Sequence, residues 1–313
     1  MRIARSVEET ASFAPSAVTI GNFDGVHAGH RRLFQQVVDA ARKCALCPSV
    51  LTFDPHPATV VAPARAPRLL TTPELRARLM GELGIEQVLI LPFTAELARL
   101  SPHDFIERIL VGALRAKMVL VGENFRFGHK QSGDTRVLAE LGKRYGYETR
   151  IVDAVKCRGR VVSSSEVRRA IARGAVSVAW RLLERPYALE GEVVPGHGIG
   201  SKQVVPTLNL KPACEMLPAN GVYVTRTEDL DNGRQWKSIT NIGTRPTFDG
   251  DSLAIETFLL EPLDGPSPKH IRVELLHRVR DERKFESPEA LKAQILRDVR
   301  RANAFFRLFK LVS

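Results

Sequence analysis

The chain has 313 residues, 44% of them hydrophobic and 26% charged, and its 46 lysines and arginines against 35 aspartates and glutamates leave a formal net charge of +11. This length predicts two domains, each able to bury a core, and no apolar run reaches the roughly 18 residues that a membrane-spanning helix needs. Residues 1–9 contain acids and lack the apolar core of a secretory signal, so we expect a cytoplasmic protein.

The basic residues are scattered along the chain rather than gathered in one tract. A positive surface suits nucleic acid, an anionic membrane or polyphosphate substrates. No aromatic-interleaved RNA-binding motif accompanies the charge, so we expect small-molecule substrates and neither a nucleic-acid nor a membrane partner. Cys44 and Cys47 form one C-x-x-C pair while Cys157 and Cys214 stand alone, which completes no zinc pattern and predicts reduced thiols.

Residues 18–30 join a short apolar run to a glycine-rich turn that carries two histidines. The periodic apolar residues that follow predict a helix, so the turn ends at a helix N-terminus, where free N–H groups favour phosphate. His27 and His30 are three residues apart and share one face of the first turn. Their imidazoles can donate to charge that develops during phosphoryl or nucleotidyl transfer. Taken alone, the stretch also fits a tight turn with two surface histidines.

Further apolar runs at residues 50–53, 88–91, 118–121 and 147–152 alternate with helical segments. This alternation predicts a doubly wound α/β domain, with a parallel sheet covered on both faces and ligands at the carboxyl ends of its strands. Three polar segments, 53–57, 122–129 and 163–168, each follow a predicted strand and therefore fall at the same edge. Singly they also fit a turn, two core phenylalanines and a serine helix cap.

The pattern changes at residues 183–186, where helical segments give way to short β-type runs. Runs at 187–194, 204–210, 221–226, 236–242, 253–260 and 271–276 predict a six-stranded closed antiparallel β-barrel. The periodic stretch 288–308 predicts a terminal helix packed against it. We therefore expect a first domain over residues 1–184 and a second over residues 185–313.

The first candidate site in the barrel is the glycine-rich segment 196–200. Because no helix pattern follows it and its glycine spacing is wrong, we exclude a dinucleotide-binding fingerprint. The remaining interpretation of this segment is a flexible glycine loop that covers phosphates. Thr207 and Asn209 offer a hydroxyl and an amide oxygen, the hard ligands that Mg²⁺ prefers. Glu256 lies among apolar neighbours, where it either faces solvent or serves as general base for a substrate hydroxyl.

Residues 21–30, 53–57, 122–128 and 163–168, in that order, resemble the four motifs of the adenylyltransferase half of prokaryotic bifunctional riboflavin kinase/FAD synthetases. The resemblance implies a nucleotidyltransferase domain that joins FMN to the AMP part of ATP and releases pyrophosphate, with His27 and His30 stabilising the reacting phosphates. Such a transfer needs positioning and charge neutralisation and no protein nucleophile. The implied nucleotide and flavin contacts are Gly21, Asn22, Phe23, Asp24, Gly29, Asp54, His56, Asn124, Arg126, Ser164, Ser165 and Arg168.

Class I aminoacyl-tRNA synthetases share the His-x-Gly-His pattern. They also carry a Lys-Met-Ser-Lys-Ser loop, whereas this chain has three serines at 163–165 followed by Arg168.

The second half resembles the riboflavin kinase half of the same family through residues 196–209, 241–247 and 280–285 and through Glu256. The resemblance implies that Thr207 and Asn209 bind Mg-ATP and that Glu256 deprotonates the terminal ribityl hydroxyl of riboflavin for attack on the γ-phosphate. The family commonly has arginines in its glycine loop, whereas Ile199 and Ser201 stand in that loop here. We therefore expect either weaker ATP binding or a greater share of the phosphate contacts for Lys202. The remaining implied ATP or flavin contacts are Gly196, Gly198, Gly200 and Arg280.

These observations predict a bifunctional enzyme that converts riboflavin to FMN and FMN to FAD with Mg²⁺ and two molecules of ATP, and whose products serve flavoenzymes. The altered glycine loop leaves a monofunctional FAD synthetase with a flavin-binding barrel as an alternative. The charge leaves a nucleic-acid-binding protein on a nucleotidyltransferase fold as a second alternative.

Overall fold

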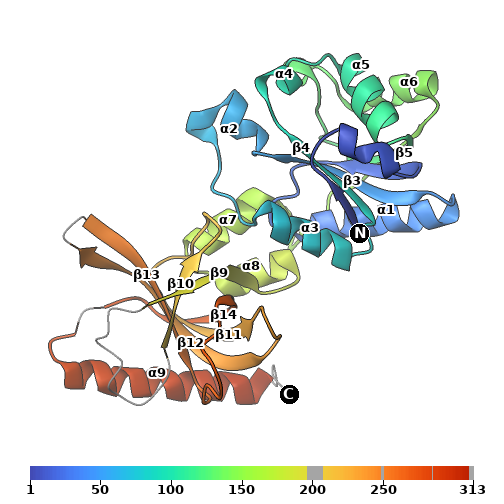
Figure 1. Cartoon of the computed structure of the whole chain (residues 1–313). Helices are drawn as coiled ribbons and strands as arrows, with labels where there is room; N and C mark the ends of the chain where they lie inside the picture. The colour runs from blue at the N-terminus through green and yellow to red at the C-terminus, as the bar shows by residue number, and fades with distance from the viewer. Residues whose placement is uncertain (196–206, 248–249, 284, 310–313) are drawn as a thin grey trace. The chain divides into compact units, whose positions relative to one another are not determined.

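The computed structural model describes residues 1–195, 207–247, 250–283 and 285–309 (Figure 1). The predicted contacts Gly196, Gly198, Gly200 and Lys202 lie outside the described residues. The chain divides into two compact units, residues 1–164 and 165–313, and each is described by itself. This division falls inside helix α7 (Ser164–Ala172), earlier in the chain than the expected boundary between residues 184 and 185, which stays a prediction.

The first unit is built on a six-stranded parallel sheet, as the alternating pattern predicts. Its strand order is β1-β4-β3-β2-β5-β6, and every neighbouring pair is parallel. The connections leave β2 in opposite directions, so the topological switch point, where open α/β sheets bind ligands, lies between β2 and β5. The strands are β1 (Arg2–Ala4), β2 (Ser16–Ile20), β3 (Cys47–Asp54), β4 (Gln87–Pro92), β5 (Ala116–Gly122) and β6 (Glu148–Val152).

Helices cover both faces of this sheet, as Figure 1 shows. One face packs against α1 (Ala28–Lys43) and α3 (Pro73–Glu82), where Phe34 and Met80 are fully buried. The other packs against the π-helix η3 (Ile106–Ala113) and α6 (Thr135–Tyr145), where Leu110 and Leu138 are fully buried. The shorter helices are η1 (Glu8–Ser12), α2 (Pro57–Val61), η2 (Pro63–Arg65), α4 (Ala95–Ala98), α5 (Pro102–Phe105) and η4 (His129–Gln131).

The strand expected before residues 163–168 does not belong to the parallel sheet, so this part of the prediction is wrong. The segment follows a two-stranded antiparallel hairpin, β7 (Lys156–Cys157) and β8 (Arg160–Val161). This hairpin forms a sheet of its own, and a hydrogen bond of Ser164 rather than the parallel sheet links the segment to the glycine turn. Helices α7 and α8 (Val176–Leu183) come next.

The second unit is a closed six-stranded barrel in the order β10-β13-β12-β11-β14-β9, with every pair antiparallel, as predicted. The fully buried side chains alternate along the strands and fill the interior, including Leu189, Ile242 and Val273 with the hydrogen-bonded hydroxyls of Thr225 and Thr240. The strands are β9 (Tyr187–Val194), β10 (Thr207–Pro212), β11 (Gly221–Asp229), β12 (Gln235–Thr247), β13 (Gly250–Leu259) and β14 (His270–Arg280).

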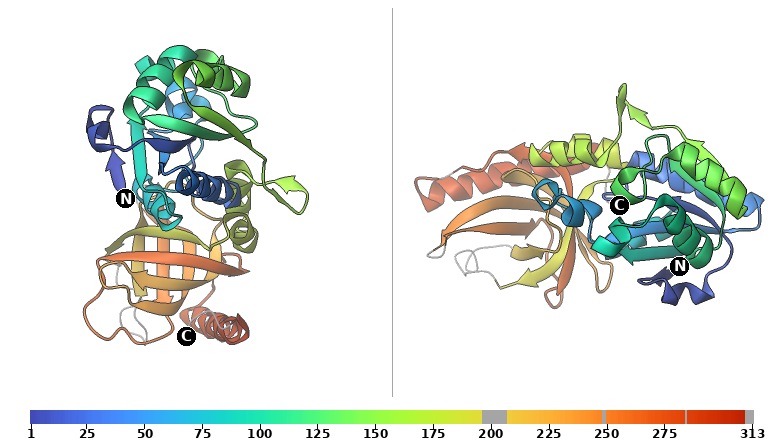
Figure 2. Two further views of the ribbon diagram at one scale, coloured as in Figure 1. Left: turned by 90° about the vertical axis from the view of Figure 1, so that its right-hand side faces the viewer. Right: turned by 90° about the horizontal axis from the view of Figure 1, so that it is seen from above.

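The terminal helix α9 (Pro288–Phe309) lies along the outside of the barrel, as predicted (Figure 2). Ala302 and Phe306 of the helix pack against Val224, Ile239 and Leu276 of three strands. All four cysteines are free, as expected. In the part of the chain that the structure describes, no helix has both the length and the apolar character needed to cross a membrane.

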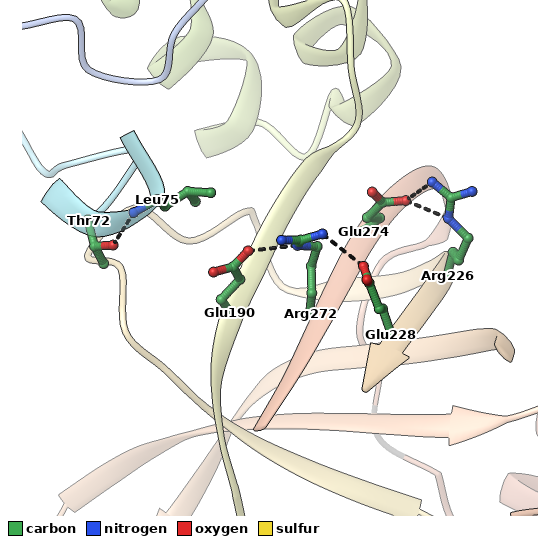
Figure 3. A network of polar contacts seen from close by, with 7 residues as sticks. All are labelled: Thr72, Leu75, Glu190, Arg226, Glu228, Arg272 and Glu274. Atoms are coloured by element: carbon green, nitrogen blue, oxygen red, sulfur yellow. Dashed lines mark hydrogen bonds and ion pairs between the residues drawn. The ribbon is translucent and has the colours of Figure 1, made fainter. Parts of the chain in front are cut away.

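Another part of the barrel's outer face carries charges paired across strands (Figure 3). Arg272 of β14 donates to Glu190 of β9 at 2.6 Å and to Glu228 of β11 at 2.8 Å. Burial acts to lower the pKa of Arg272, but its hydrogen bond to Glu190 and the nearby carboxylates raise it overall. Arg226 and Glu274 form a second pair at 2.7 Å. These pairs join β9, β14 and β11 where the barrel closes.

Candidate functional site

The two histidines of the glycine turn lie together at the start of α1. His27 is the N-cap residue, and its Nδ1 accepts a hydrogen bond from the backbone N–H of His30 at 3.4 Å. The two rings stack with centroids 3.5 Å apart and an interplanar angle of 21°. His27 is only 5% exposed. The structure therefore places both imidazoles on one face of the first helical turn, beside the N–H groups that favour an anion.

The turn that carries these histidines has an unusual backbone. Phe23, Gly25 and Val26 have φ angles of 50°, 80° and 40°, in the left-handed region that non-glycine residues rarely adopt. Each such residue other than glycine costs on the order of 1–3 kcal/mol, and packing has to maintain it. The ring of Phe23 supplies that packing, since it meets the His30 ring edge-on at 5.1 Å and the Phe34 ring at 4.8 Å. The turn is thus held in one shape before any substrate arrives.

Asp24 anchors the turn to residues 70 and 71. Its carboxylate is 2% exposed and accepts hydrogen bonds from the N–H groups of Leu70 and Thr71 and from the Thr71 hydroxyl, at 3.0 to 3.1 Å. The N–H of Gly25 donates to the same hydroxyl at 3.1 Å. These contacts fasten the turn to the segment before α3, and a direct contact of Asp24 with substrate stays a prediction.

Ser164 reaches the turn from the far end of the first unit. Its hydroxyl donates to the backbone carbonyl of Asp24 at 2.8 Å. Val162 lies close as well, because a Cβ added at Gly29 would meet its carbonyl oxygen at 3.8 Å and the His27 ring at 3.1 Å. Ser165 and Arg168 continue along α7 in the second unit, and their predicted contacts with the triphosphate stay predictions.

The carboxyl end of β3 lies beside the glycine turn. Asp54 ends this strand, and His56 caps α2 by accepting from the N–H of Ala58 at 3.1 Å. The Nε2 of His56 lies 3.0 Å from the side-chain amide of Asn22. Gly21 joins the same strand ends, since its N–H donates to the carbonyl of Leu51 at 3.1 Å. The structure therefore brings the first two predicted motifs into contact.

A buried arginine that the sequence reasoning missed lies beneath this contact. Arg76 of α3 is 2% exposed, and its Nη1 donates to the Asn22 carbonyl and to the Thr52 hydroxyl. Burial lowers the pKa of Arg76, while Asp24 and Asp54 act to raise it. Its sequence neighbourhood, a proline-initiated helix with charged residues, carries no signal that distinguishes it from a solvated surface arginine.

The third motif follows β5. Phe127 is buried and stacks on Phe125 with centroids 5.5 Å apart, so Phe127 belongs to the core. Asn124 and Arg126 are exposed, and Arg126 pairs with Asp134 at 3.4 Å. Their predicted contacts with nucleotide or flavin stay predictions.

In the barrel, strand register brings the predicted base beside a predicted ATP ligand. Glu256 of β13 pairs with Asn209 of β10 on one side and with Asn241 of β12 on the other. Direct cross-strand partners share a face, with Cβ atoms about 4.5–5.5 Å apart. Leu208 and Thr257, next to them in sequence, point into the interior, so these three half-buried polar side chains lie on the outer face. Asn241 belongs to a matched stretch, but only the register singles it out.

A cavity of about 540 Å³ opens beside this row. Thr207 and Asn209 contribute to its wall, so both predicted Mg²⁺ ligands face space large enough for a small ligand. Glu256 does not line it but neighbours Asn209 on the next strand. The wall also includes Glu192, Val193, Val194, Pro195, Leu208, Ser267, Pro268, Lys269 and His270.

Arg280, a predicted ATP or flavin contact, is tied to α9. Its Nε donates to the buried carboxylate of Asp298 at 2.8 Å, and its guanidinium lies 5.7 Å from the centre of the Phe285 ring. Gln294 completes the tie by donating to the same carboxylate at 2.7 Å. The observed contacts fasten the segment after β14 to the helix, and a contact of Arg280 with substrate stays a prediction.

Comparison with known proteins accounts for both units. A family model described as FAD synthetase matches residues 9–166, and one described as riboflavin kinase matches residues 183–306. The bifunctional riboflavin kinase/FMN adenylyltransferase of Escherichia coli K12 is 37% identical over 314 residues, which cover 99% of each chain. The chain belongs to the bifunctional riboflavin kinase/FMN adenylyltransferase family.

A second member and a solved structure also match over most of the chain. The Pseudomonas fluorescens member is 36% identical over 287 residues, covering 91% of each chain. A crystal structure described as a macrolide-efflux protein from Streptococcus pneumoniae matches with a TM-score of 0.85 and 28% identity, over 96% of this chain and 98% of the other. The family membership and the two-part fold confirm the resemblance read from the sequence.

Proposed function

We propose that the chain phosphorylates riboflavin to FMN with one ATP and adenylylates FMN to FAD with a second ATP, releasing pyrophosphate. The observation that carries the proposal is that one chain holds both family halves, each with its polar site. The first half presents the stacked His27 and His30 at a helix N-terminus. The second presents Glu256 beside Asn209. Residues 1–184 and 185–313 remain the domains that we assign to the two activities.

In the adenylyltransferase half, an oxygen of the FMN phosphate attacks the α-phosphorus of ATP, and the bond to pyrophosphate breaks as the new P–O bond forms. The N-terminus of α1 and the two imidazoles stabilise the negative charge that develops on the phosphates. The anchored turn supplies alignment, since Asp24 and the Phe23 ring fix its shape. Ser164 lies at the same turn, where its hydroxyl donates to the Asp24 carbonyl, and on triphosphate binding that hydroxyl would exchange this acceptor for a phosphate oxygen.

In the kinase half, Glu256 accepts the proton of the terminal ribityl hydroxyl, the freed oxygen attacks the γ-phosphorus of ATP, and ADP leaves. Asn209 and Asn241 flank the carboxylate and orient it together with the hydroxyl. Thr207 and Asn209 bind the ATP phosphates from the wall of the cavity. Their hydroxyl and amide oxygens fit Mg²⁺, which when bound would neutralise phosphate charge.

The proposal is tested with purified protein, riboflavin, ATP and Mg²⁺, followed by chromatography of the flavins. We expect FMN to appear first and FAD to follow. FAD formation from supplied FMN, without riboflavin-dependent ADP production, would instead establish the monofunctional FAD synthetase. Salt-dependent RNA or DNA binding without flavin turnover would establish the nucleic-acid-binding alternative. The cytoplasmic location and the supply of flavins to flavoenzymes stay predictions.

A further inference from the structure

Arg76 occupies an unusual place for an arginine. It is 2% exposed, lies on α3 in contact with residues at the ends of β2 and β3, and its Nε finds no hydrogen-bond partner among the residues that the structure describes. Removing a guanidinium from water is unfavourable, and an apolar side chain of similar volume fills such a space without that cost. The hydrogen bonds that Arg76 makes therefore explain a buried cation at this position better than packing alone does.

What Arg76 holds is the backbone of the glycine turn. Its Nη1 donates to the carbonyl of Asn22 and lies 3.3 Å from the Thr52 hydroxyl, which itself donates to the same carbonyl at 3.2 Å. One carbonyl oxygen thus receives two donors, one from α3 and one from β3. These bonds fix Asn22 relative to both elements.

The side chain of Asn22 passes this constraint to the next motif. Its amide lies 3.0 Å from Nε2 of His56, and the other nitrogen of that ring caps α2. The constraint also acts in the opposite direction, because Asp24 of the turn grips Leu70 and Thr71 just before α3. The turn is therefore fastened to α3 and the residues before it at two points. At one, an arginine side chain from the helix holds the turn's backbone; at the other, an aspartate side chain from the turn holds the backbone before the helix.

We propose that Arg76 is a positioning residue for adenylyl transfer, which holds the Asn22 carbonyl so that the Asn22–His56 contact stays aligned with the histidine turn. This inference rests on the proposed adenylyltransferase activity. Because misplacement of reacting groups by about 1 Å can cost roughly 10²-fold in rate, a loosened Asn22 should be visible in catalysis while the fold persists.

The test compares Arg76→Met and Arg76→Lys with Arg78→Met, the same substitution at an exposed arginine two positions along the same helix. FMN formation by the same molecules reports whether the rest of the chain remains intact. We expect Arg76→Met to lower kcat for FAD formation at least ten-fold, Arg76→Lys to recover part of it, and Arg78→Met to match the wild type. FMN formation should stay within two-fold in all three.

A double-mutant cycle with His56→Ala separates positioning from simple stability. If Arg76 acts through the Asn22–His56 contact, His56→Ala costs several-fold less FAD formation in the Arg76→Met background than in the wild type. Additive effects, or a lowered melting temperature with unchanged kcat and KM, would overturn the inference. If Arg76→Met does not fold, Thr52→Val replaces it in the cycle, since it removes the second donor to the Asn22 carbonyl. A wild type that makes no FAD would instead refute the proposed function itself.

Discussion

Gly29→Ala gives a sharp test of the histidine turn because the change is a single methyl group. The added Cβ would lie 3.1 Å from Cε1 and 3.2 Å from Nδ1 of His27, closer than ordinary van der Waals contact. The ring has to give by a few tenths of an ångström, and it is buried and stacked on His30 at 3.5 Å, so both imidazoles shift.

The expected effects on stability and on catalysis differ. The helix propensity of alanine exceeds that of glycine by up to about 1 kcal/mol, which offsets the cost of the close contact with His27. The free energy of unfolding should therefore change little. Displaced imidazoles should lower kcat/KM for FAD formation by about ten- to a hundred-fold. FMN formation by the same protein should not change.

The assay is steady-state FAD formation from FMN and ATP, with unfolding in urea measured in parallel. The matched control is Gly81→Ala on α3, where the nearest atoms to the added Cβ belong to the flexible side chain of Met1, from 3.1 Å. Wild-type FAD formation by Gly29→Ala would refute the claim that the stacked pair must keep its place.

Three further predictions concern contacts inside each unit taken by itself. Asp24→Asn should destabilise the first unit by about 2 kcal/mol in urea unfolding, because a buried carboxylate accepts hydrogen bonds from Leu70 and Thr71; an unchanged midpoint would contradict that anchoring. Asp298→Ala should cost the barrel unit about 3 kcal/mol, because Arg280 loses its buried partner, and Asp298→Asn should cost less. Burial raises the pKa of Tyr223 to about 12, so above pH 10 the unfolded chain releases a proton that the folded barrel retains. The wild-type free energy of unfolding should therefore fall between about pH 10 and pH 12, by at most about 1.4 kcal/mol per pH unit for this group, and Tyr223→Phe should flatten that fall.

Hydropathy patterns predicted the main elements because burial on both faces of a parallel sheet imposes continuous apolar runs. The runs at residues 50–53 and 118–121 became β3 and β5 for that reason. Strand β1 escaped prediction, since Arg2–Ala4 pairs with a single neighbour and only Ala4 is buried. The hairpin β7–β8 was misread because two-residue strands leave no periodic signal.

Some site residues were likewise predictable from sequence spacing, whereas others are identified only by the three-dimensional structure. The apolar periodicity after the glycine turn placed His27 and His30 at a helix start, and their spacing of three residues put them on one helical face. The row formed by Asn209, Glu256 and Asn241 depends on strand register, which side-chain alternation alone does not specify. Arg76 was missed because a helix propensity says nothing about which carbonyl a buried side chain reaches.

The central claim is that one chain carries two separable activities, and paired single substitutions test it most directly. With riboflavin, ATP and Mg²⁺, His27→Ala should accumulate FMN without FAD. Glu256→Ala should form no FMN from riboflavin yet convert supplied FMN to FAD at the wild-type rate. The loss of both activities in either folded variant, or of neither in both, would contradict the assignment of the two reactions to the two halves.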